Sequence, residues 1–183
     1  MRGSDHDESG QARALTLLIP VEPGKENELV GVLDELPSGA GSPLARVEGT
    51  HFARWVVMPQ LVYAGPPQRR DRWRASRLLF TSNFDGPLDA YLVGLRTGLR
   101  ADGDTVFGHC VGYPGSADAG EWERWLRAHR VPTALFFAAY GDQTVHEVRA
   151  NLDLRARLIA FALEAQALAP AQVHARFQEV FPL

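Results

Sequence analysis

The feature that constrains this chain most is a repeated succession of an apolar strand, an acidic turn and a helix. The first copy runs from Arg77 to Leu99 and turns at Asp85-Gly86. The second runs from Thr133 to about Ala167 and turns at Gly141-Asp142. A strand followed by an amphipathic helix buries its apolar surface when the helix lies on the sheet. The repeat therefore predicts a sheet layered with helices.

The remaining elements follow from hydrophobic periodicity. Apolar runs and period-two alternation indicate strands, whereas apolar residues at helical spacing indicate helices. The predicted strands are Leu15–Val21, Arg46–Tyr63, Arg77–Phe84, Asp104–Gly112 and Thr133–Tyr140. The predicted helices are Lys25–Leu36, Pro87–Leu99, Gly120–His129, Thr144 to about Ala167, and Pro170–Phe177. Up to Gly112 the order is β-α-β-β-α-β, the succession of a ferredoxin-like domain.

The predicted fold class is therefore α+β. We expect a ferredoxin-like antiparallel sheet with helices on one face, extended by a C-terminal helix-strand-helix. Residues 1–12 contain too little apolar surface to pack, so we predict that they are disordered. Residues 13–183 contain no linker-like stretch and are long enough for one sizeable core, so we predict a single domain.

Composition excludes several classes of partner. The formal net charge of −3 gives no reason to expect nucleic acid or an anionic membrane. No apolar run approaches the roughly 20 residues that span a bilayer. The polar, acidic start does not resemble a secretory signal, so we expect a cytoplasmic protein. The single cysteine and the spacing of the histidines predict no disulfide and no metal site of the zinc-protease kind.

The second predicted strand carries two polar side chains among apolar neighbours. Alternation puts His51 and Trp55 on one face, and Thr50 and Arg54 on the other. Burying such groups is costly unless each finds a partner. In a functional site, His51 would be an acid, base or ligand, and Arg54 would anchor an anionic or carbonyl group. The structural alternative is that Arg54 pairs with a buried acid such as Asp85, while His51 bonds a backbone carbonyl.

Two further positions have competing explanations. Asp85, before Gly86-Pro87, either belongs to a site with Asn83 or caps the following helix. Cys110 would need a base nearby to become a nucleophile. Its neighbour His109 points to the opposite face of the predicted strand, so we expect Cys110 to be a small buried core residue.

Two segments of this sequence, taken as a pair, resemble a known family. They are Thr50-His51-Phe52-Ala53-Arg54-Trp55-Val56-Val57, and Leu79-Phe80-Thr81-Ser82-Asn83-Phe84-Asp85-Gly86 followed by Tyr91-Leu92. Together they resemble a bacterial module of the dimeric α+β barrel type that is found near dye-decolourising peroxidases, and the resemblance covers roughly Leu15 to Leu163. It implies ferredoxin-like topology, a sheet surface that can enclose a ligand, and frequent dimerisation through that sheet. Some members of the wider superfamily bind haem, and others act on polyketide-like or small aromatic substrates without a cofactor.

The chain also departs from the peroxidases themselves. They have two such domains and a proximal histidine in the second, whereas this chain has room for one compact domain. The phrase Asn83-Phe84-Asp85-Gly86 lacks the leading glycine of the peroxidase signature. The resemblance therefore does not carry peroxidase activity with it.

The sequence predicts a homodimer with a small-molecule pocket on the open sheet face. The expected function is that of a small bacterial oxidoreductase, or a related enzyme, that acts on an apolar or aromatic metabolite. Two alternatives are a non-catalytic binding or accessory module, and a cofactor-free cyclase or monooxygenase. The candidate catalytic residues are His51, Arg54, Asp85 and His109, and the candidate ligand-binding residues are Asn83, Trp55, Phe107 and Tyr140. If haem is the cofactor, the candidate axial ligands are His51, His109 and His146.

Overall fold

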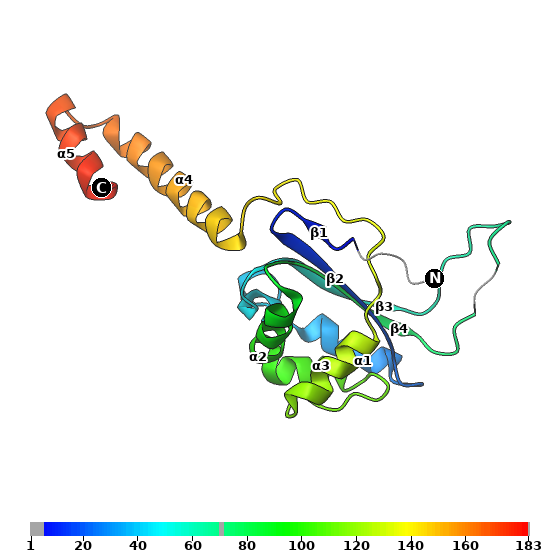
Figure 1. Cartoon of the computed structure of the whole chain (residues 1–183). Helices are drawn as coiled ribbons and strands as arrows, with labels where there is room; N and C mark the ends of the chain where they lie inside the picture. Colours follow the sequence, from blue (N-terminus) through cyan, green and yellow to red (C-terminus); the bar gives the residue numbers. More distant parts are fainter. Residues whose placement is uncertain (1–5, 70–71, 183) are drawn as a thin grey trace. The chain divides into compact units, whose positions relative to one another are not determined.

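A computed structural model describes residues 6–69 and 72–182 of the chain. The chain divides into two compact units, one up to Asp142 and one from Gln143 onward. The single domain expected over residues 13–183 stays a prediction. The first unit contains a four-stranded antiparallel sheet with strand order β1-β2-β4-β3, together with helices α1, α2 and α3, so the predicted α+β class is confirmed (Figure 1).

The bounds of the strands and helices differ from the sequence predictions mainly at their ends. The strands are β1 (Glu8–Ser9), β2 (Ala12–Pro20), β3 (Thr50–Met58) and β4 (Arg77–Asp85). The helices of the first unit are α1 (Glu26–Glu35), α2 (Leu88–Phe107) and α3 (Ala119–Ala128), with 3-10 turns η1 (Gly39–Gly41) and η2 (Pro43–Arg46) between α1 and β3. Of the segment expected to be disordered, residues 1–5 lie outside the described residues, whereas residues 8 and 9 form β1 and residue 12 begins β2.

Strand β4 is the centre of the sheet and has two different faces. It pairs antiparallel with β2 from Arg77 to Asp85, and with β3 on its other side. Its alternate side chains Leu78, Phe80, Ser82 and Phe84 are buried. The apolar ones form one core with side chains of α1, α2 and α3, which lie together on one side of the sheet (Figure 1). The side chains between them leave the sheet on the opposite, open face.

The predicted strand Asp104–Gly112 is wrong, because α2 continues to Phe107. After the break at Arg100, Gly103, Val106 and Phe107 are all buried, and this spacing fits the core-facing side of a helix. The apolar run around Phe107 is short, and a run of that length does not distinguish a strand from a buried helical turn.

The chain then turns where strand pairing was expected. The Asp104 carboxylate accepts hydrogen bonds from the Tyr113 hydroxyl at 2.6 Å and from the Ser116 backbone N–H at 2.9 Å. These bonds fold residues 113–116 back against the end of α2.

The predicted strand Thr133–Tyr140 is also wrong, since this segment forms no strand. The edge of β2 beside it already bonds β1 and the residues that follow α3, through the bridge between Leu17 and Arg130. Contacts with residues 6–11 hold the segment in place, including the backbone bond from His6 to the Thr133 carbonyl at 2.9 Å. At its end Gly10 and Gly141 touch, so that a Cβ on Gly10 would clash with the Gly141 oxygen.

The second unit consists of α4 (Val145–Ala165) and α5 (Pro170–Val180). Helix α4 begins with a capping box, in which the Thr144 hydroxyl accepts the Glu147 backbone N–H and the Glu147 carboxylate accepts the Thr144 backbone N–H. The predicted helices at both positions are confirmed. Within residues 6–69 and 72–182, none of the helices has the combination of length and hydrophobicity that crossing a bilayer requires. The expected cytoplasmic location stays a prediction.

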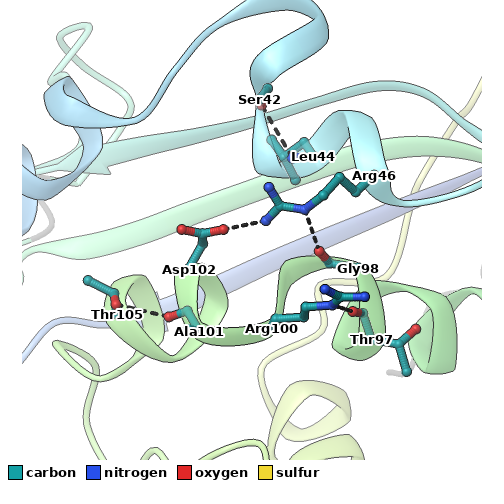
Figure 2. Close-up of polar contacts among 9 residues, drawn as sticks. All are labelled: Ser42, Leu44, Arg46, Thr97, Gly98, Arg100, Ala101, Asp102 and Thr105. Carbon is teal, nitrogen blue, oxygen red and sulfur yellow. Dashed lines mark hydrogen bonds and ion pairs between the residues drawn. The ribbon is translucent and has the colours of Figure 1, made fainter.

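Helix α2 is broken at Arg100, whose φ of 50° and ψ of −133° are not helical. Arg46 of η2 spans the break, as Figure 2 shows: its Nε donates to the Gly98 carbonyl at 3.0 Å and its Nη2 pairs with Asp102. The Arg100 side chain itself donates to the Thr97 carbonyl at 3.2 Å. A non-glycine residue with this backbone conformation is strained, because its Cβ crowds the adjacent peptide groups.

Replacing Arg100 with glycine removes this strain. We expect Arg100→Gly to raise the free energy of unfolding by about 1 kcal/mol, and the melting temperature by about 3 °C. Urea unfolding and thermal melts measure both quantities. Arg100→Ala is the matched control, because it removes the same side-chain hydrogen bond but keeps the Cβ. Equal stability of the two variants would show that the backbone is not strained there.

Candidate functional site

The open face of the sheet brings two of the candidate residues together. Along β3, Phe52, Arg54 and Val56 are exposed, while Ala53, Trp55 and Val57 pack against the core, as alternation predicts. Arg54 pairs in register with Thr81 of β4. A shallow pocket of about 320 Å³ lies there, lined by Phe52, Ala53, Arg54, Thr81 and Asn83. Arg54 and Asn83 therefore share one pocket.

Arg54 makes one side-chain hydrogen bond at this pocket. Its Nε donates to the Thr81 hydroxyl at 3.2 Å, in an exposed position. It is therefore not the buried partner of Asp85 that the structural alternative required. The guanidinium group carries five N–H donors, so most of them stay available for an anionic or carbonyl oxygen.

A bulge at the start of β3 decides where His51 lies. The strand register shifts between Thr50 and Phe52, so that His51 is an extra residue opposite β4. Thr50 pairs with Phe84, and its hydroxyl lies 3.2 Å from the Tyr91 hydroxyl of α2. Thr50 thus faces the helices, and its predicted place on the same face as Arg54 is wrong because one inserted residue reverses the alternation.

The structure joins His51 to Asp85. The Nε2 atom of His51 lies 2.7 Å from the Oδ1 atom of Asp85, and the side chains are only 17% and 16% exposed. When Nε2 carries the proton that the carboxylate accepts, Nδ1 keeps a lone pair and acts as a base; once protonated, it acts as an acid. Among the described residues, Nδ1 makes no hydrogen bond.

Asp85 does not cap the following helix. Helix α2 begins at Leu88, its N-cap is Pro87, and no side chain bonds the free N–H groups there. The carboxylate of Asp85 instead lies at the end of β4, two residues beyond Asn83, so both side chains leave the same face of that strand. The carboxylate is thereby positioned for His51 at the border of the open face.

Three of the candidate ligand-binding residues lie apart from this pocket. Phe107 is fully buried in the core, and the Trp55 ring packs 5.7 Å from Phe80 and 6.4 Å from Phe107, between ring centroids. The indole Nε1 of Trp55 is buried without a hydrogen-bond partner in the part of the chain that the structure describes. Tyr140 is 73% exposed in the irregular segment after Thr133. Packing accounts for Trp55 and Phe107 without a ligand.

His109 and Cys110 also belong to the helical side. The Nδ1 atom of His109 lies 2.8 Å from the Thr105 carbonyl, and its Nε2 lies 3.9 Å from the Glu28 carboxylate of α1. Cys110 is 1% exposed, and burial, with a smaller effect of the Glu22 charge, raises the pKa of its thiol to about 12. The thiol therefore stays protonated near neutral pH, and Cys110 is the buried core residue that the sequence predicted.

The sheet-face pocket does not fit a haem. A haem needs an axial ligand within an apolar pocket, and the lining contains no histidine, cysteine, methionine or tyrosine. His146 is exposed in the first turn of α4, in the other unit. Over the described ranges 6–69 and 72–182, no cluster of three or more histidine, cysteine, aspartate or glutamate side chains could hold a metal ion.

Three residues of the pocket lining, Phe52, Ala53 and Thr81, were not among the sequence candidates. Phe52 is 77% exposed at its rim, and Thr81 holds Arg54. Alternation had already put Phe52 on the same face as Arg54, so an exposed aromatic beside an arginine was a signal available in the sequence. Thr81 carried no comparable signal, because its role depends on the register between β3 and β4.

Comparisons with known proteins assign no function to these residues. Searches against models of protein families, against curated proteins and against solved structures found no match. Function is therefore inferred from the open face and from the His51–Asp85 pair.

Removing the Asp85 carboxylate should destabilise the sheet. We expect Asp85→Ala to lower the free energy of unfolding by about 1–3 kcal/mol, because the half-buried His51 ring loses its hydrogen-bond partner. Asp89→Ala is the control: Asp89 is 84% exposed and pairs with Arg127, and an exposed pair contributes less than about 1 kcal/mol. Equilibrium unfolding in urea compares the two. Equal losses would contradict the assigned role of the His51–Asp85 contact.

Proposed function

We propose that this chain is an enzyme of the dimeric α+β barrel type. It holds an apolar or aromatic small molecule against the open sheet face and moves a proton with the His51–Asp85 pair. The observation that carries the proposal is a half-buried histidine–carboxylate hydrogen bond of 2.7 Å, at the border of a face whose pocket contains a single cation, Arg54.

The lining of the pocket suggests the class of substrate. The exposed ring of Phe52 offers a stacking surface for an aromatic or other flat molecule. The planar guanidinium of Arg54 matches a carboxylate or a carbonyl oxygen. The Asn83 amide, two residues beyond Thr81 in the same pocket lining, adds a hydrogen-bond donor and a hydrogen-bond acceptor. We therefore propose an apolar or aromatic metabolite that carries a carbonyl or a carboxylate.

The topology supports the ferredoxin-like part of this proposal. The succession β2-α1-β3-β4-α2, with β4 between β2 and β3, matches the first five elements of such a domain. Short bridges, Leu17 to Arg130 and Val21 to Cys110, occupy the other edge of β2, where a last strand would lie. A second copy over the open face would cover Phe52 and Val56 and enclose the pocket, which is why we include a homodimer in the proposal.

The same residues suggest how catalysis proceeds. Arg54 holds the carbonyl oxygen, and the Nδ1 atom of His51 takes a proton from the neighbouring carbon. The bond electrons move onto the carbonyl oxygen, and the enolate that forms is stabilised by the guanidinium charge. Asp85 keeps the proton on Nε2 and stabilises the charged imidazole. An enolate closes a ring on a second carbonyl of its own molecule, as in a cyclase, or reacts with dioxygen, as in a cofactor-free monooxygenase.

Arg54 can be tested with 8-anilinonaphthalene-1-sulfonate, a fluorescent aromatic anion. We expect Arg54→Met to weaken its binding about 10-fold, because one charge-assisted hydrogen bond is lost. Stability should change by less than about 1 kcal/mol, since Arg54 is exposed. Arg127→Met, on α3, is the control and should leave the affinity unchanged. Equal weakening by both variants would contradict an anion-binding role for Arg54.

Catalysis can be separated from binding by incubating the protein with a bacterial metabolite extract. Mass spectrometry should show an aromatic or polyketide-like carbonyl compound consumed by the unmodified protein and spared by His51→Gln. Compounds that both proteins retain but neither converts would favour the binding-module alternative.

Hemin is titrated in parallel: a stoichiometric Soret band that disappears in His51→Gln would replace the cofactor-free proposal with a haem oxidoreductase.

A further inference from the structure

Tyr91 of α2 contacts the last paired residues before the bulge in β3. Its ring stacks on Phe84 of β4, with the ring centroids 3.8 Å apart and the ring planes 9° from parallel. Its hydroxyl lies 3.2 Å from the hydroxyl of Thr50, the residue of β3 that pairs with Phe84. Tyr91 thus joins both members of this pair to the helical layer.

The Tyr91 side chain has little freedom to move. It is 4% exposed, it lies in the first turn of α2, and its backbone N–H donates to the Pro87 carbonyl at 3.1 Å. Burial raises the pKa of the phenol, although the neighbouring hydroxyls of Ser82 and Thr50 act in the opposite direction. The phenol therefore stays protonated near neutral pH and keeps its hydroxyl for Thr50.

Two contacts with Asp85 lie on either side of Thr50. The Asp85 backbone N–H donates to the Gly49 carbonyl at 2.9 Å, and the Asp85 carboxylate meets the His51 ring. Gly49 has a φ of 73°, in the left-handed region that glycine adopts without strain. The turn at Gly49, the contacts with Asp85 and the hydroxyl of Tyr91 together fix the chain from Gly49 to His51.

A second arrangement of this segment competes with the observed one. If the strand were unbroken, alternation would turn Thr50 to the open face and His51 toward the core. The Thr50 hydroxyl would then leave Tyr91, and the buried phenol would lose that partner. His51 would leave Asp85 at the same time. The contact between Tyr91 and Thr50 therefore favours the bulged arrangement over the unbroken one.

We propose that Tyr91 is a positioning residue: by holding Thr50 on the helical side, it maintains the bulge that directs the His51 ring to Asp85. Tyr91 does not line the pocket of the open face, so its effect on the site passes through Thr50. Its contribution to catalysis rests on the proposed function. The positioning of His51 is a property of the fold, and it can be measured without a substrate.

Hydrogen exchange measures how often the bulge opens, because a hydrogen-bonded proton exchanges with water when its bond breaks. Nuclear magnetic resonance of the isotope-labelled full chain follows two protons, the one between His51 and Asp85 and the one on the Asp85 amide. We expect Tyr91→Phe to raise both exchange rates about 5-fold, the factor that one net hydrogen bond contributes to an equilibrium. If the imidazole proton exchanges too fast to be seen, the Asp85 amide carries the measurement.

Ser82→Ala is the matched control. Ser82 is 1% exposed and lies beside the same phenol, but it belongs to β4 and not to the bulge. This variant should leave both exchange rates nearly unchanged, and urea unfolding of each variant gives its global stability. The proposal is overturned if Tyr91→Phe causes no rise, if Ser82→Ala causes the same rise, or if the rates merely follow the global unfolding constant across the variants.

Two substitutions of Thr50 test whether Tyr91 acts through this residue. Thr50→Val keeps the branched shape without the hydroxyl, so it should raise the exchange rates as much as Tyr91→Phe does, and the double variant should add nothing further. Thr50→Ser keeps the hydroxyl and should keep the original rates. Effects that multiply in the double variant would show that the two hydroxyls act independently, which overturns the proposal. If Tyr91→Phe does not fold, the two Thr50 variants decide the question.

The result is separate from that of the proposed function. Exchange rates that do not respond to Tyr91→Phe overturn this inference and leave the proposed function standing, because His51 would still meet Asp85. Faster exchange in Tyr91→Phe and Thr50→Val, but not in Ser82→Ala, supports the inference whether or not the metabolite incubation finds a substrate.

Discussion

The structure of the first unit depends on the alternation of side chains along β4. Because this strand bonds neighbours on both sides, its register determines which residues of β2 and β3 face the helices. Leu78, Phe80 and Phe84 bind the sheet to α1, α2 and α3, and the same alternation forces Thr81 and Asn83 onto the opposite face. The core and the candidate site are therefore two consequences of one alternation. A change of register by one residue would turn the apolar side chains to the open face and the polar ones toward the helices.

The bulge in β3 interrupts this alternation of side chains. It also produces the contact between His51 and Asp85, on which the proposed chemistry depends. An unbroken strand would have directed His51 toward the core with Ala53 and Trp55. The extra residue instead lets the His51 ring meet Asp85 at the end of β4. Bulges of this kind commonly redirect a side chain beside an active site. The local disruption of the ladder is offset by a half-buried hydrogen bond, so the strand end is stabilised by the same contact that would serve catalysis.

Much of the secondary structure was predictable, but less of the site. The three long strands, α1, α3, α4 and α5 all follow from apolar spacing. The two failures have different causes. Asp104–Gly112 failed because its short apolar run around Phe107 belongs to the end of α2, and such a run does not distinguish a strand from a helical turn. Thr133–Tyr140 failed because the edge of β2 beside it already bonds β1 and the residues that follow α3. Within the site, alternation correctly separated Arg54 from Trp55. The partner of His51 could not be predicted, because one bulge reverses the phase and leaves no signal in composition.

The role of the open sheet face is tested most directly by locating where an aromatic anion binds. Benzophenone-4-carboxylate can be cross-linked to the protein by light and its adducts mapped by mass spectrometry. We expect adducts on Phe52 and its neighbours in β3 and β4, and we expect these adducts to be lost when Arg54 is changed to methionine. Adducts concentrated on α1, α2 or α3, or an open-face adduct indifferent to Arg54, would contradict the claim that the uncovered face of the sheet is the binding surface.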